Sequence, residues 1–291
     1  MVIIGFPDYA GQARCLADRL AVPYLEVGIH RFPDGESKVT VPSQLPAHVV
    51  VCRSLDQPND KLVELLLCAK TARQLGALRL TLVAPYLCYM RQDIAFSPGE
   101  CVSQRLIGEF LADLFDDVVT VDPHLHRISR LEQAIPAAGT VSLTATALLG
   151  EFVVSRWENP LLVGPDKESE QWVRALAERC NFDFCVAEKT RTGDKEVEVT
   201  LPDIEIRNRD ALLVDDMAST GHTLIEAAQA LSRRGANSVN ALITHALFNE
   251  GTMDSMRAAG IDFVGSTDSV AHPSNVVGLA PLLASAIQRL R

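Results

Sequence analysis

The stretch LLVDDMASTGHTL, from Leu212 to Leu224, decides the fold. An apolar run of strand type ends here in two adjacent carboxylates, Asp215 and Asp216, and the chain then turns through Ser219 into a helical segment. In parallel sheets, ligands bind beyond the carboxyl ends of the strands. We therefore expect this turn to line a binding site at the end of a buried strand.

The turn has the chemistry of a phosphate site. Backbone N–H groups from Met217 to Thr223, together with the N-terminus of the following helix, would suit a phosphate, and Ser219, Thr220 and Thr223 add hydroxyl donors. The two carboxylates would repel that phosphate unless they face vicinal sugar hydroxyls or a divalent cation. The stretch predicts a phosphorylated-sugar site. The alternative is that the carboxylates and Ser219 simply cap the helix.

Outward from this stretch, short apolar runs alternate with longer segments of helical period along the whole chain. This alternation is typical of βαβ units and predicts an α/β fold with mostly parallel sheets. The expected strands are Val2–Phe6, Val49–Cys52, Leu80–Ala84, Val118–Val121, Pro160–Val163, Phe184–Ala187, Ala211–Val214 and Val239–Thr244. The expected helices are Gln12–Leu20, Lys61–Leu75, Ser103–Phe115, Ser169–Cys180 and Thr220–Arg234.

The alternation occurs twice, which predicts two similar domains, residues 1–142 and 143–291. Small and turn-forming residues between Ala137 and Leu143 interrupt the periodic segments, and the boundary is expected there.

Composition narrows the classes of function. The chain has 291 residues, of which 47% are hydrophobic and 22% charged, as in a globular protein without disordered tracts. A net charge of −10 argues against a nucleic-acid or membrane-surface binder, and no apolar run approaches the ~20 residues of a membrane span. Seven cysteines without a Cys-x-x-Cys pair favour a reducing compartment. We expect a soluble cytoplasmic protein that binds neither nucleic acid nor membranes.

Six stretches together resemble one family. VDDMASTGHT is similar to the phosphoribosyl diphosphate loop of type I phosphoribosyltransferases, and five more resemble segments of the ribose-phosphate diphosphokinases, also called phosphoribosyl pyrophosphate synthetases. The five follow the family's order along nearly the whole chain. They are RFPDGESKV (Arg31–Val39), PYLCYMRQD (Pro85–Asp93), TVDPHLH (Thr120–His126), VGPDKES (Val163–Ser169) and EKTR (Glu188–Arg191). The resemblance implies two phosphoribosyltransferase-like domains.

The resemblance assigns ATP binding to the first two of the five stretches. Acidic and polar groups of the first would reach the adenine and ribose, and those of the second would meet the phosphates and base. The planar guanidinium of Arg91 suits charge-assisted bonds to phosphate. The alternatives are a surface ion pair for Arg91 and an ordinary polar turn for RFPDGE. The implied ATP-binding residues are Phe32, Asp34, Gly35, Glu36, Arg91 and Gln92.

His124 and Asp166 match the family's magnesium-site residues. Magnesium prefers oxygen ligands and water, so Asp166 is the firmer assignment as a ligand, and the imidazole of His124 is a less usual one. The alternative for His124 is a capping or packing histidine after a strand. No role is evident for His126.

Lys189 and Arg191 open the segment KTRTGDKEVEV, whose mixed charges and turn formers predict an exposed loop. The alternative is a solvated hairpin without function. The resemblance implies a catalytic flap whose two cations meet the transferring diphosphoryl group.

The implied reaction joins these parts. The C1 hydroxyl of ribose 5-phosphate attacks the β-phosphorus of Mg-ATP, which gives 5-phosphoribosyl 1-diphosphate and AMP. Asp215 and Asp216 would hold the ribose hydroxyls or their bound cation, and Arg191 would also contact the sugar phosphate. The implied 5-phosphate loop consists of Ser219, Thr220, Gly221, His222 and Thr223.

The chain departs from the family pattern at three places. Ser219 replaces an aspartate, His222 replaces a glycine, and Lys167–Ser169 replaces a segment with two glycines. The segment IAFSPGECVS resembles the archaeal-type members, and the chain stops at Arg291 soon after its last helix. From these features we expect a homodimer or higher homo-oligomer.

Two other functions stay open on the sequence. A phosphoribosyltransferase would use the same sugar-phosphate loop but would not need the two ATP-like stretches. A catalytically silent regulatory homologue would explain the departures, yet it should have lost Lys189, Arg191 or Asp166, and all three are present.

Overall fold

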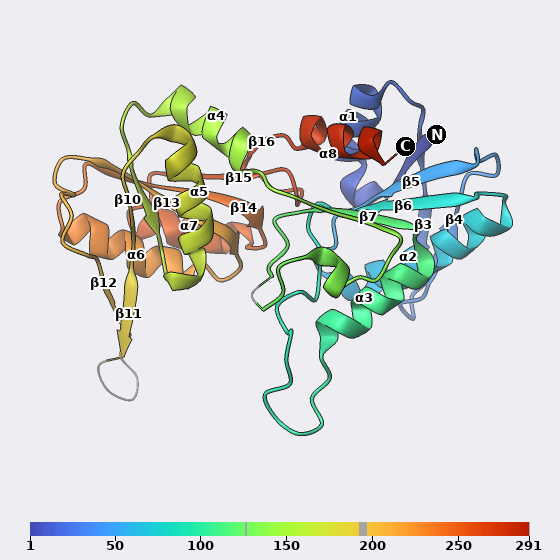
Figure 1. The fold of residues 1–291 in the computed structure, drawn as a ribbon, viewed down its shortest axis with the longest axis horizontal. Helices are drawn as coiled ribbons and strands as arrows, with labels where there is room; N and C mark the ends of the chain where they lie inside the picture. Colours follow the sequence, from blue (N-terminus) through green and yellow to red (C-terminus); the bar gives the residue numbers. More distant parts are fainter. Residues whose placement is uncertain (126, 192–196, 291) are drawn as a thin grey trace. The chain divides into compact units, whose positions relative to one another are not determined.

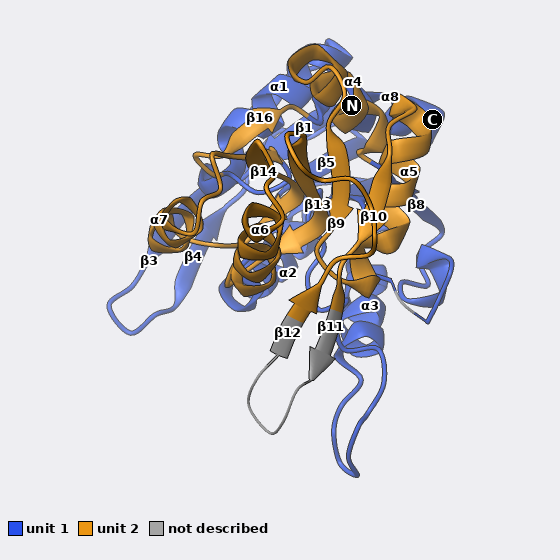
Figure 2. Cartoon of the chain, turned by 90° about the vertical axis from the view of Figure 1, so that its left-hand side faces the viewer, with its two compact units in different colours: residues 1–144, 269–271, 279–291 blue, residues 145–268, 272–278 orange. Residues whose placement is uncertain are grey.

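The computed structural model describes residues 1–125, 127–191 and 197–290, and the chain divides into two compact units (Figures 1 and 2). The first unit consists of residues 1–144, 269–271 and 279–291, and the second of residues 145–268 and 272–278. Within the described residues, each unit has one six-stranded parallel sheet and one two-stranded hairpin. The predicted α/β fold with two mostly parallel sheets is confirmed.

The sheet of the first unit has the strand order β2-β1-β5-β6-β7-β8, and every neighbouring pair is parallel. Its central strands are buried on both faces, which explains their continuous runs of Val, Ile and Leu. The strands are β1 (Val2–Gly5), β2 (Tyr24–Glu26), β5 (His48–Cys52), β6 (Arg79–Val83), β7 (Asp117–Val121) and β8 (Gly139–Leu143).

Helices cover both faces of this sheet (Figure 1). Helix α1 packs on β1 and α8, and α8 also contacts β7 and β8, while α2 and α3 lie together on the opposite face. Along the chain, the segment between β2 and β5 forms an antiparallel hairpin of β3 (Gly28–Arg31) and β4 (Ser37–Thr40). This hairpin is separate from the six-stranded sheet and contacts α2. The helices are α1 (Ala10–Leu20), α2 (Pro58–Gln74), α3 (Ser103–Leu114) and α8 (Ala280–Arg289), with short 3₁₀ turns η1 (Pro7–Tyr9) and η2 (Leu131–Gln133).

The second unit has the strand order β10-β9-β13-β14-β15-β16, again with parallel neighbours. Helices α4 and α5 lie on one face, and α6 and α7 on the other (Figure 2). The strands are β9 (Leu161–Gly164), β10 (Phe184–Val186), β13 (Asp210–Ala218), β14 (Ser238–Ala246), β15 (Phe263–Thr267) and β16 (Asn275–Val277). The other elements are α4 (Thr146–Arg156), η3 (Lys167–Ser169), α5 (Glu170–Cys180), α6 (His222–Arg233), α7 (Glu250–Ala258) and the hairpin strands β11 (Glu188–Arg191) and β12 (Val197–Thr200).

The two units repeat one order of elements. From β1 to α2, and again from β9 to α6, the chain forms the same series of elements. The series is strand, 3₁₀ turn, helix, strand, hairpin, strand and helix. In both units the first strand is followed by a Pro-Asp pair, Pro7-Asp8 and Pro165-Asp166. The chain order of the strands reverses between β1 and β5 and between β9 and β13. These two places are topological switch points, where open α/β sheets bind ligands.

The structure differs from the sequence prediction in several segments. Strands β2, β15 and β16 and helices α4 and α7 were not among the expected elements, and the predicted exposed loop that opens at Lys189 contains strands β11 and β12. The residues from Ala137 to Leu143, predicted as an interruption, contain strand β8, which pairs with β7. The last helix α8 belongs to the first unit, because its buried face of Leu283 and Ile287 packs there. The division into domains at residues 142 and 143 stays a prediction. Among the described residues, no helix has the length and apolar character needed to cross a membrane.

Candidate active site

Three carboxylates gather at the topological switch point of the second unit. Asp215 and Asp216 belong to the end of β13, and Asp166 follows β9 by two residues. Strands β9 and β13 are parallel neighbours with Leu213 opposite Val163, so their carboxyl ends meet at one edge of the sheet. The predicted sugar-site residues and the predicted metal ligand Asp166 are therefore brought together.

The carboxylates repel one another electrostatically. Asp216 is buried and Asp215 half-buried, and the N–H of Asp216 donates to Oδ1 of Asp215 at 2.9 Å. Burial raises the pKa of Asp215 well above its usual value, and the charges of Asp216 and Asp166 raise it further. Hydroxyl donors or a cation beside this carboxyl would favour its ionised form. Perturbed carboxyls in such positions are typical of functional sites.

Asp166 has a structural role that fixes its side chain. Its Oδ1 accepts hydrogen bonds from the N–H groups of Glu168 and Ser169, at 3.1 and 3.3 Å, and so caps the 3₁₀ turn η3. The Ser169 hydroxyl donates back to the Asp166 carbonyl at 2.6 Å. The segment Lys167–Ser169 thus forms a cap where the family resemblance implies glycines. This cap can be predicted from the sequence, because an aspartate followed three residues later by a serine has the spacing of a capping box.

The turn after β13 presents the start of a long helix to solvent. Ser219 and Thr220 are exposed, Thr223 is half-buried, and α6 begins directly after Gly221. The N-cap residue of α6 is Gly221, which has no side chain to cap the helix, and the interpretation of this stretch as a helix cap stays an alternative. The first N–H groups of a helix lack partners within it and attract anions. His222, the first residue of α6, is exposed and leaves this end open.

Gly221 lies at a position where a side chain would be strained. Its φ of +70° lies in the left-handed region, and a Cβ atom would lie 2.5 Å from Cε of Met256 and 3.0 Å from Cγ2 of Thr252 on α7. Gly221→Ala should lower protein stability by about 1 kcal/mol or more and weaken binding of a phosphorylated sugar. Thermal unfolding and calorimetric titration measure the two effects. Gly251→Ala is the control, because a Cβ there meets only Asn249 at 3.5 Å, and it should leave sugar binding unchanged.

The predicted ATP residues of the first stretch form the tip of the β3–β4 hairpin. The Phe32 N–H donates to the Glu36 carbonyl at 2.8 Å, and the Gly35 N–H donates to the Phe32 carbonyl at 3.0 Å. Gly35 has a φ of +95°, and Asp34 accepts a hydrogen bond from the Glu36 N–H at 3.2 Å. The Phe32 ring is 42% exposed and meets the His30 ring edge to face. The tip thus presents an aromatic face and two carboxylates to solvent.

Arg91 and Gln92 follow β6 in the same unit. Arg91 is exposed, and no ion pair joins it to another residue in the part of the chain that the structure describes. The alternative of a surface ion pair is therefore not found there. Gln92 instead fixes the loop to α3, since its Oε1 accepts a hydrogen bond from Ser103 Oγ at 2.9 Å and its carbonyl accepts one from the Gln104 N–H at 3.1 Å.

The remaining predicted residues are only partly described. His124 is half-buried after β7 and belongs to the first unit, whereas Asp166 belongs to the second. Lys189 and Arg191 lie in β11, but their side chains and the flap tip, residues 192–196, lie outside the described part, as does His126. Within the described residues, no group of three or more His, Cys, Asp or Glu could hold a metal ion.

Two family models match the chain in succession. The model of the N-terminal domain of ribose phosphate pyrophosphokinase matches residues 1–114, and that of the phosphoribosyl transferase domain matches residues 142–272. A ribose-phosphate pyrophosphokinase of Methanopyrus kandleri is 34% identical over 293 residues, covering 100% of this chain and 99% of that protein. This chain belongs to the ribose-phosphate pyrophosphokinase family. The family predicted from the sequence is confirmed.

Other members of the ribose-phosphate pyrophosphokinase family show similar likeness. The protein of Saccharolobus solfataricus is 32% identical over 277 residues, 93% of each chain. Among solved structures, phosphoribosylpyrophosphate synthetase from Mycobacterium smegmatis has the same fold, with a TM-score of 0.84 over 99% of this chain and 98% of that one. The two sequences are 22% identical, so this comparison is evidence for the fold alone.

Proposed function

We propose that this chain transfers the diphosphoryl group of Mg-ATP to the C1 hydroxyl of ribose 5-phosphate, giving 5-phosphoribosyl 1-diphosphate and AMP. The observation that carries the proposal is the pairing of a carboxylate cluster, Asp166, Asp215 and Asp216, with the start of α6, whose N-cap residue is a glycine. One end of this site attracts hydroxyls or a cation, and the other attracts a phosphate. A ribose phosphate has both kinds of group.

The sugar phosphate would span the turn between β13 and α6. The first N–H groups of α6 and the hydroxyls of Ser219, Thr220 and Thr223 bind the 5-phosphate. Asp215 and Asp216 accept hydrogen bonds from the ribose hydroxyls, and these bonds stabilise their ionised forms. This orientation holds the C1 hydroxyl at a fixed place, which supplies much of the rate of a bimolecular transfer.

The nucleotide would be held by the first unit. The exposed Phe32 ring offers a stacking face for adenine, and Asp34 and Glu36 offer acceptors for its amino group or the ribose hydroxyls. Arg91 supplies a cation for the phosphates, and Gln92 supplies polar atoms for the base or the phosphates.

The residues present suit a magnesium ion that the protein and the nucleotide would hold together. Asp166 is a hard oxygen ligand already oriented through Oδ1 by two N–H groups, which suits magnesium, whereas the His124 imidazole is a less usual ligand for it. Proteins commonly hold magnesium by one or two carboxylates together with substrate phosphates. When bound, the ion neutralises phosphate charge near the reacting centre.

The transfer itself is an in-line displacement. The C1 oxygen forms a bond to the β-phosphorus, the bond from that phosphorus to the bridging oxygen of the α-phosphate breaks, the hydroxyl proton passes to solvent, and AMP leaves. Lys189 and Arg191 stabilise the charge that develops on the diphosphoryl group, and Arg191 also contacts the sugar phosphate. Orientation and charge neutralisation carry such a step without a protein nucleophile.

One incubation tests the function. With ATP, ribose 5-phosphate and magnesium, the expected products are AMP and 5-phosphoribosyl 1-diphosphate in equal amounts, and EDTA should stop their formation. ADP as the product would contradict the proposal. No turnover with any divalent metal would favour the silent regulatory homologue, and nucleotide formation from 5-phosphoribosyl 1-diphosphate and a nucleobase would favour a phosphoribosyltransferase.

Ser219→Ala tests the phosphate loop. Loss of one hydrogen bond to a charged group should cost about 1.5–3 kcal/mol, and KM for ribose 5-phosphate should rise roughly tenfold or more while kcat changes less. Steady-state kinetics in both substrates measure this. Ser255→Ala on α7 is the control and should behave like the wild type. Among the described residues, the Ser255 hydroxyl bonds only the Gly251 carbonyl. If Ser219→Ala abolishes turnover, the loop has a different role.

The cellular setting is part of the same proposal. We propose a cytoplasmic homodimer or higher homo-oligomer that binds neither nucleic acid nor membranes. The net charge of −10 supports the absence of nucleic-acid and membrane binding, and the seven cysteines, all free in the described part of the chain, support a reducing compartment. Light scattering after gel filtration gives the oligomeric state, and a monomer at working concentrations would contradict it.

A further inference from the structure

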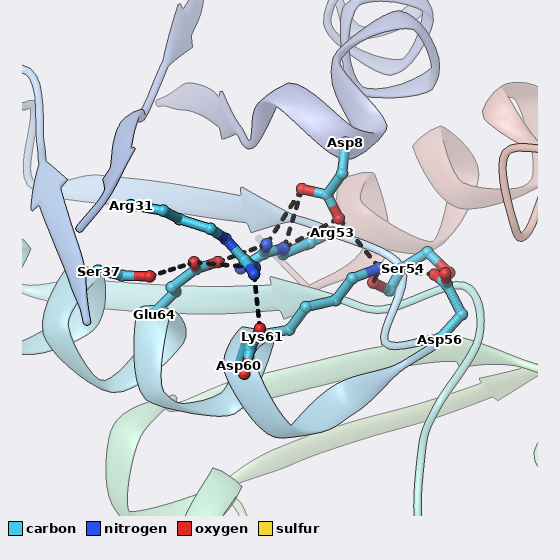
Figure 3. Close-up of polar contacts among 9 residues, drawn as sticks. All are labelled: Asp8, Arg31, Ser37, Arg53, Ser54, Asp56, Asp60, Lys61 and Glu64. Atoms are coloured by element: carbon cyan, nitrogen blue, oxygen red, sulfur yellow. Dashed lines mark hydrogen bonds and ion pairs between the residues drawn. The ribbon is translucent and has the colours of Figure 1, made fainter. Parts of the chain in front are cut away.

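A network of charged side chains with a buried ion pair at its centre fills the switch point of the first unit (Figure 3). Its centre is Glu64 of α2, whose side chain is 1% exposed and accepts a hydrogen bond from Nη2 of Arg53 at 2.6 Å. Arg53 follows β5 and is 4% exposed, and its Nε donates to both carboxylate oxygens of Asp8, at 3.1 and 3.2 Å. Lys61 bonds Asp8 at 3.0 Å and Asp56 at 2.7 Å.

The network occupies the position that the sugar site has in the second unit. Asp8 follows β1 as Asp166 follows β9, and Arg53 follows β5. Burial raises the pKa of Asp8, but the charges of Arg53 and Lys61 outweigh it and hold the pKa below its usual value. Asp8 is therefore an ionised partner of two internal cations. The first unit fills its switch point with its own side chains, which points to a role other than binding a sugar.

The same carboxylate of Glu64 reaches the β3–β4 hairpin (Figure 3). Its Oε1 accepts a hydrogen bond from Ser37 Oγ at 2.7 Å and lies 3.6 Å from Nη2 of Arg31. Nη1 of Arg31 bonds Asp60 at 2.7 Å. Arg31 and Ser37 are opposite residues in the hairpin and are the last pair before the loop of residues 32–36. Both ends of that loop are thus tied to α2.

The two ties differ in strength. Arg31 and Asp60 are 56% and 60% exposed, and exposed ion pairs contribute little because water and salt screen them. Glu64 is buried and paired with Arg53, so its position is fixed by a pair that is costly to break. Ser37 donates to this fixed carboxylate. The hydrogen bond between Ser37 and Glu64 is therefore the rigid link from the helix to the loop.

We propose that Glu64 is a positioning residue for the nucleotide. Through Ser37 it holds the loop of residues 32–36, with Phe32, Asp34 and Glu36, in the shape that binds ATP. Loss of the link weakens ATP binding without changing the transfer step, because the loop must then be ordered at the expense of binding free energy. The inference rests on the proposed function where it names ATP as the ligand of this loop.

Ser37→Ala tests the link and leaves the ion pair of Arg53 and Glu64 intact. KM for ATP should rise about fivefold, while kcat stays within about twofold and KM for ribose 5-phosphate is unchanged. Ser37→Thr keeps the hydroxyl and should restore KM. Lys38→Ala is the matched control, because Lys38 is the next residue of β4, is exposed, and its side chain makes no hydrogen bond or ion pair with another described residue.

A second measurement separates this inference from the proposed function. Amide hydrogen exchange of residues 28–40 in the nucleotide-free protein should be faster in Ser37→Ala than in the wild type and in Lys38→Ala. Unchanged exchange, or a fall in kcat with KM for ATP unchanged, would overturn the positioning role. If the wild type forms no AMP, the proposed reaction fails, while exchange and calorimetric ATP binding still decide whether Ser37 and Glu64 position the loop.

Discussion

Lys189→Ala is expected to lower the rate constant of diphosphoryl transfer on the order of 10³-fold, with ATP affinity changed only a few fold. In the proposed mechanism the lysine charge is needed chiefly when negative charge develops on the transferring group, so its loss should affect the transition state more than the bound substrate. Single-turnover kinetics give the rate constant, and calorimetric titration gives the ATP affinity. Arg191→Ala should have a similar but smaller effect.

The control for this change is Lys70→Ala. Lys70 is exposed on α2 and lies outside the assigned segments, so its loss alters net charge without touching the proposed site. It should retain wild-type rates. If Lys189→Ala weakens ATP binding as much as it slows the reaction, Lys189 is a binding residue and the flap mechanism is wrong.

Asp215→Asn should lower kcat/KM on the order of 10²-fold and at the same time raise the melting temperature of the ligand-free protein. Activity falls because the amide weakens the hold on the ribose hydroxyls or cation beside the reacting oxygen. Stability rises because the substitution removes a charge that burial and two neighbouring carboxylates disfavour. Kinetics with both substrates and thermal unfolding in EDTA measure the two effects.

The pH dependence of this stability gain follows from the sign of the pKa shift. The folded-state pKa of Asp215 is raised above its unfolded value, so ionisation costs stability, and the cost grows as pH rises from the unfolded pKa through the folded pKa. Asp215→Asn should therefore be more stabilising at neutral pH than in acid. A gain that is larger in acid, or a lower melting temperature at neutral pH, would contradict this.

Asp210→Asn provides the matched control at the other end of β13. Asp210 accepts hydrogen bonds from Asn237 and Ser238 near the amino end of the strand. The same chemical change there should leave kcat/KM unchanged and should not raise the melting temperature. A mild kinetic effect of Asp215→Asn, beside a severe one of Ser219→Ala, would reverse the roles assigned along this stretch.

The sequence determined the features that depend on local patterns. Apolar runs alternating with segments of helical period predicted the central parallel strands and most of the helices between them, but not the strands β2, β8, β15 and β16. That pattern is set by which faces a segment must bury. The stretch from Leu212 to Leu224 predicted a strand end, a turn and a helix start. The family followed from short motifs in a fixed order. Roles for Lys189 and Arg191 likewise come from the motif and stay predictions.

Only the tertiary structure decided the features that depend on distant contacts. Strand β8 is short and weakly apolar and is recognised by its pairing with β7, and α8 is placed by its packing on α1. The sequence offered Ser37 and Glu64 as unremarkable polar residues, 27 positions apart, and only the fold joins them in a hydrogen bond. The raised pKa of Asp215 likewise depends on Asp166, which arrives beside it because β9 and β13 are neighbours. The local sequence pattern determines which secondary structure a segment adopts, whereas tertiary packing determines which charged side chains lie close together in the interior.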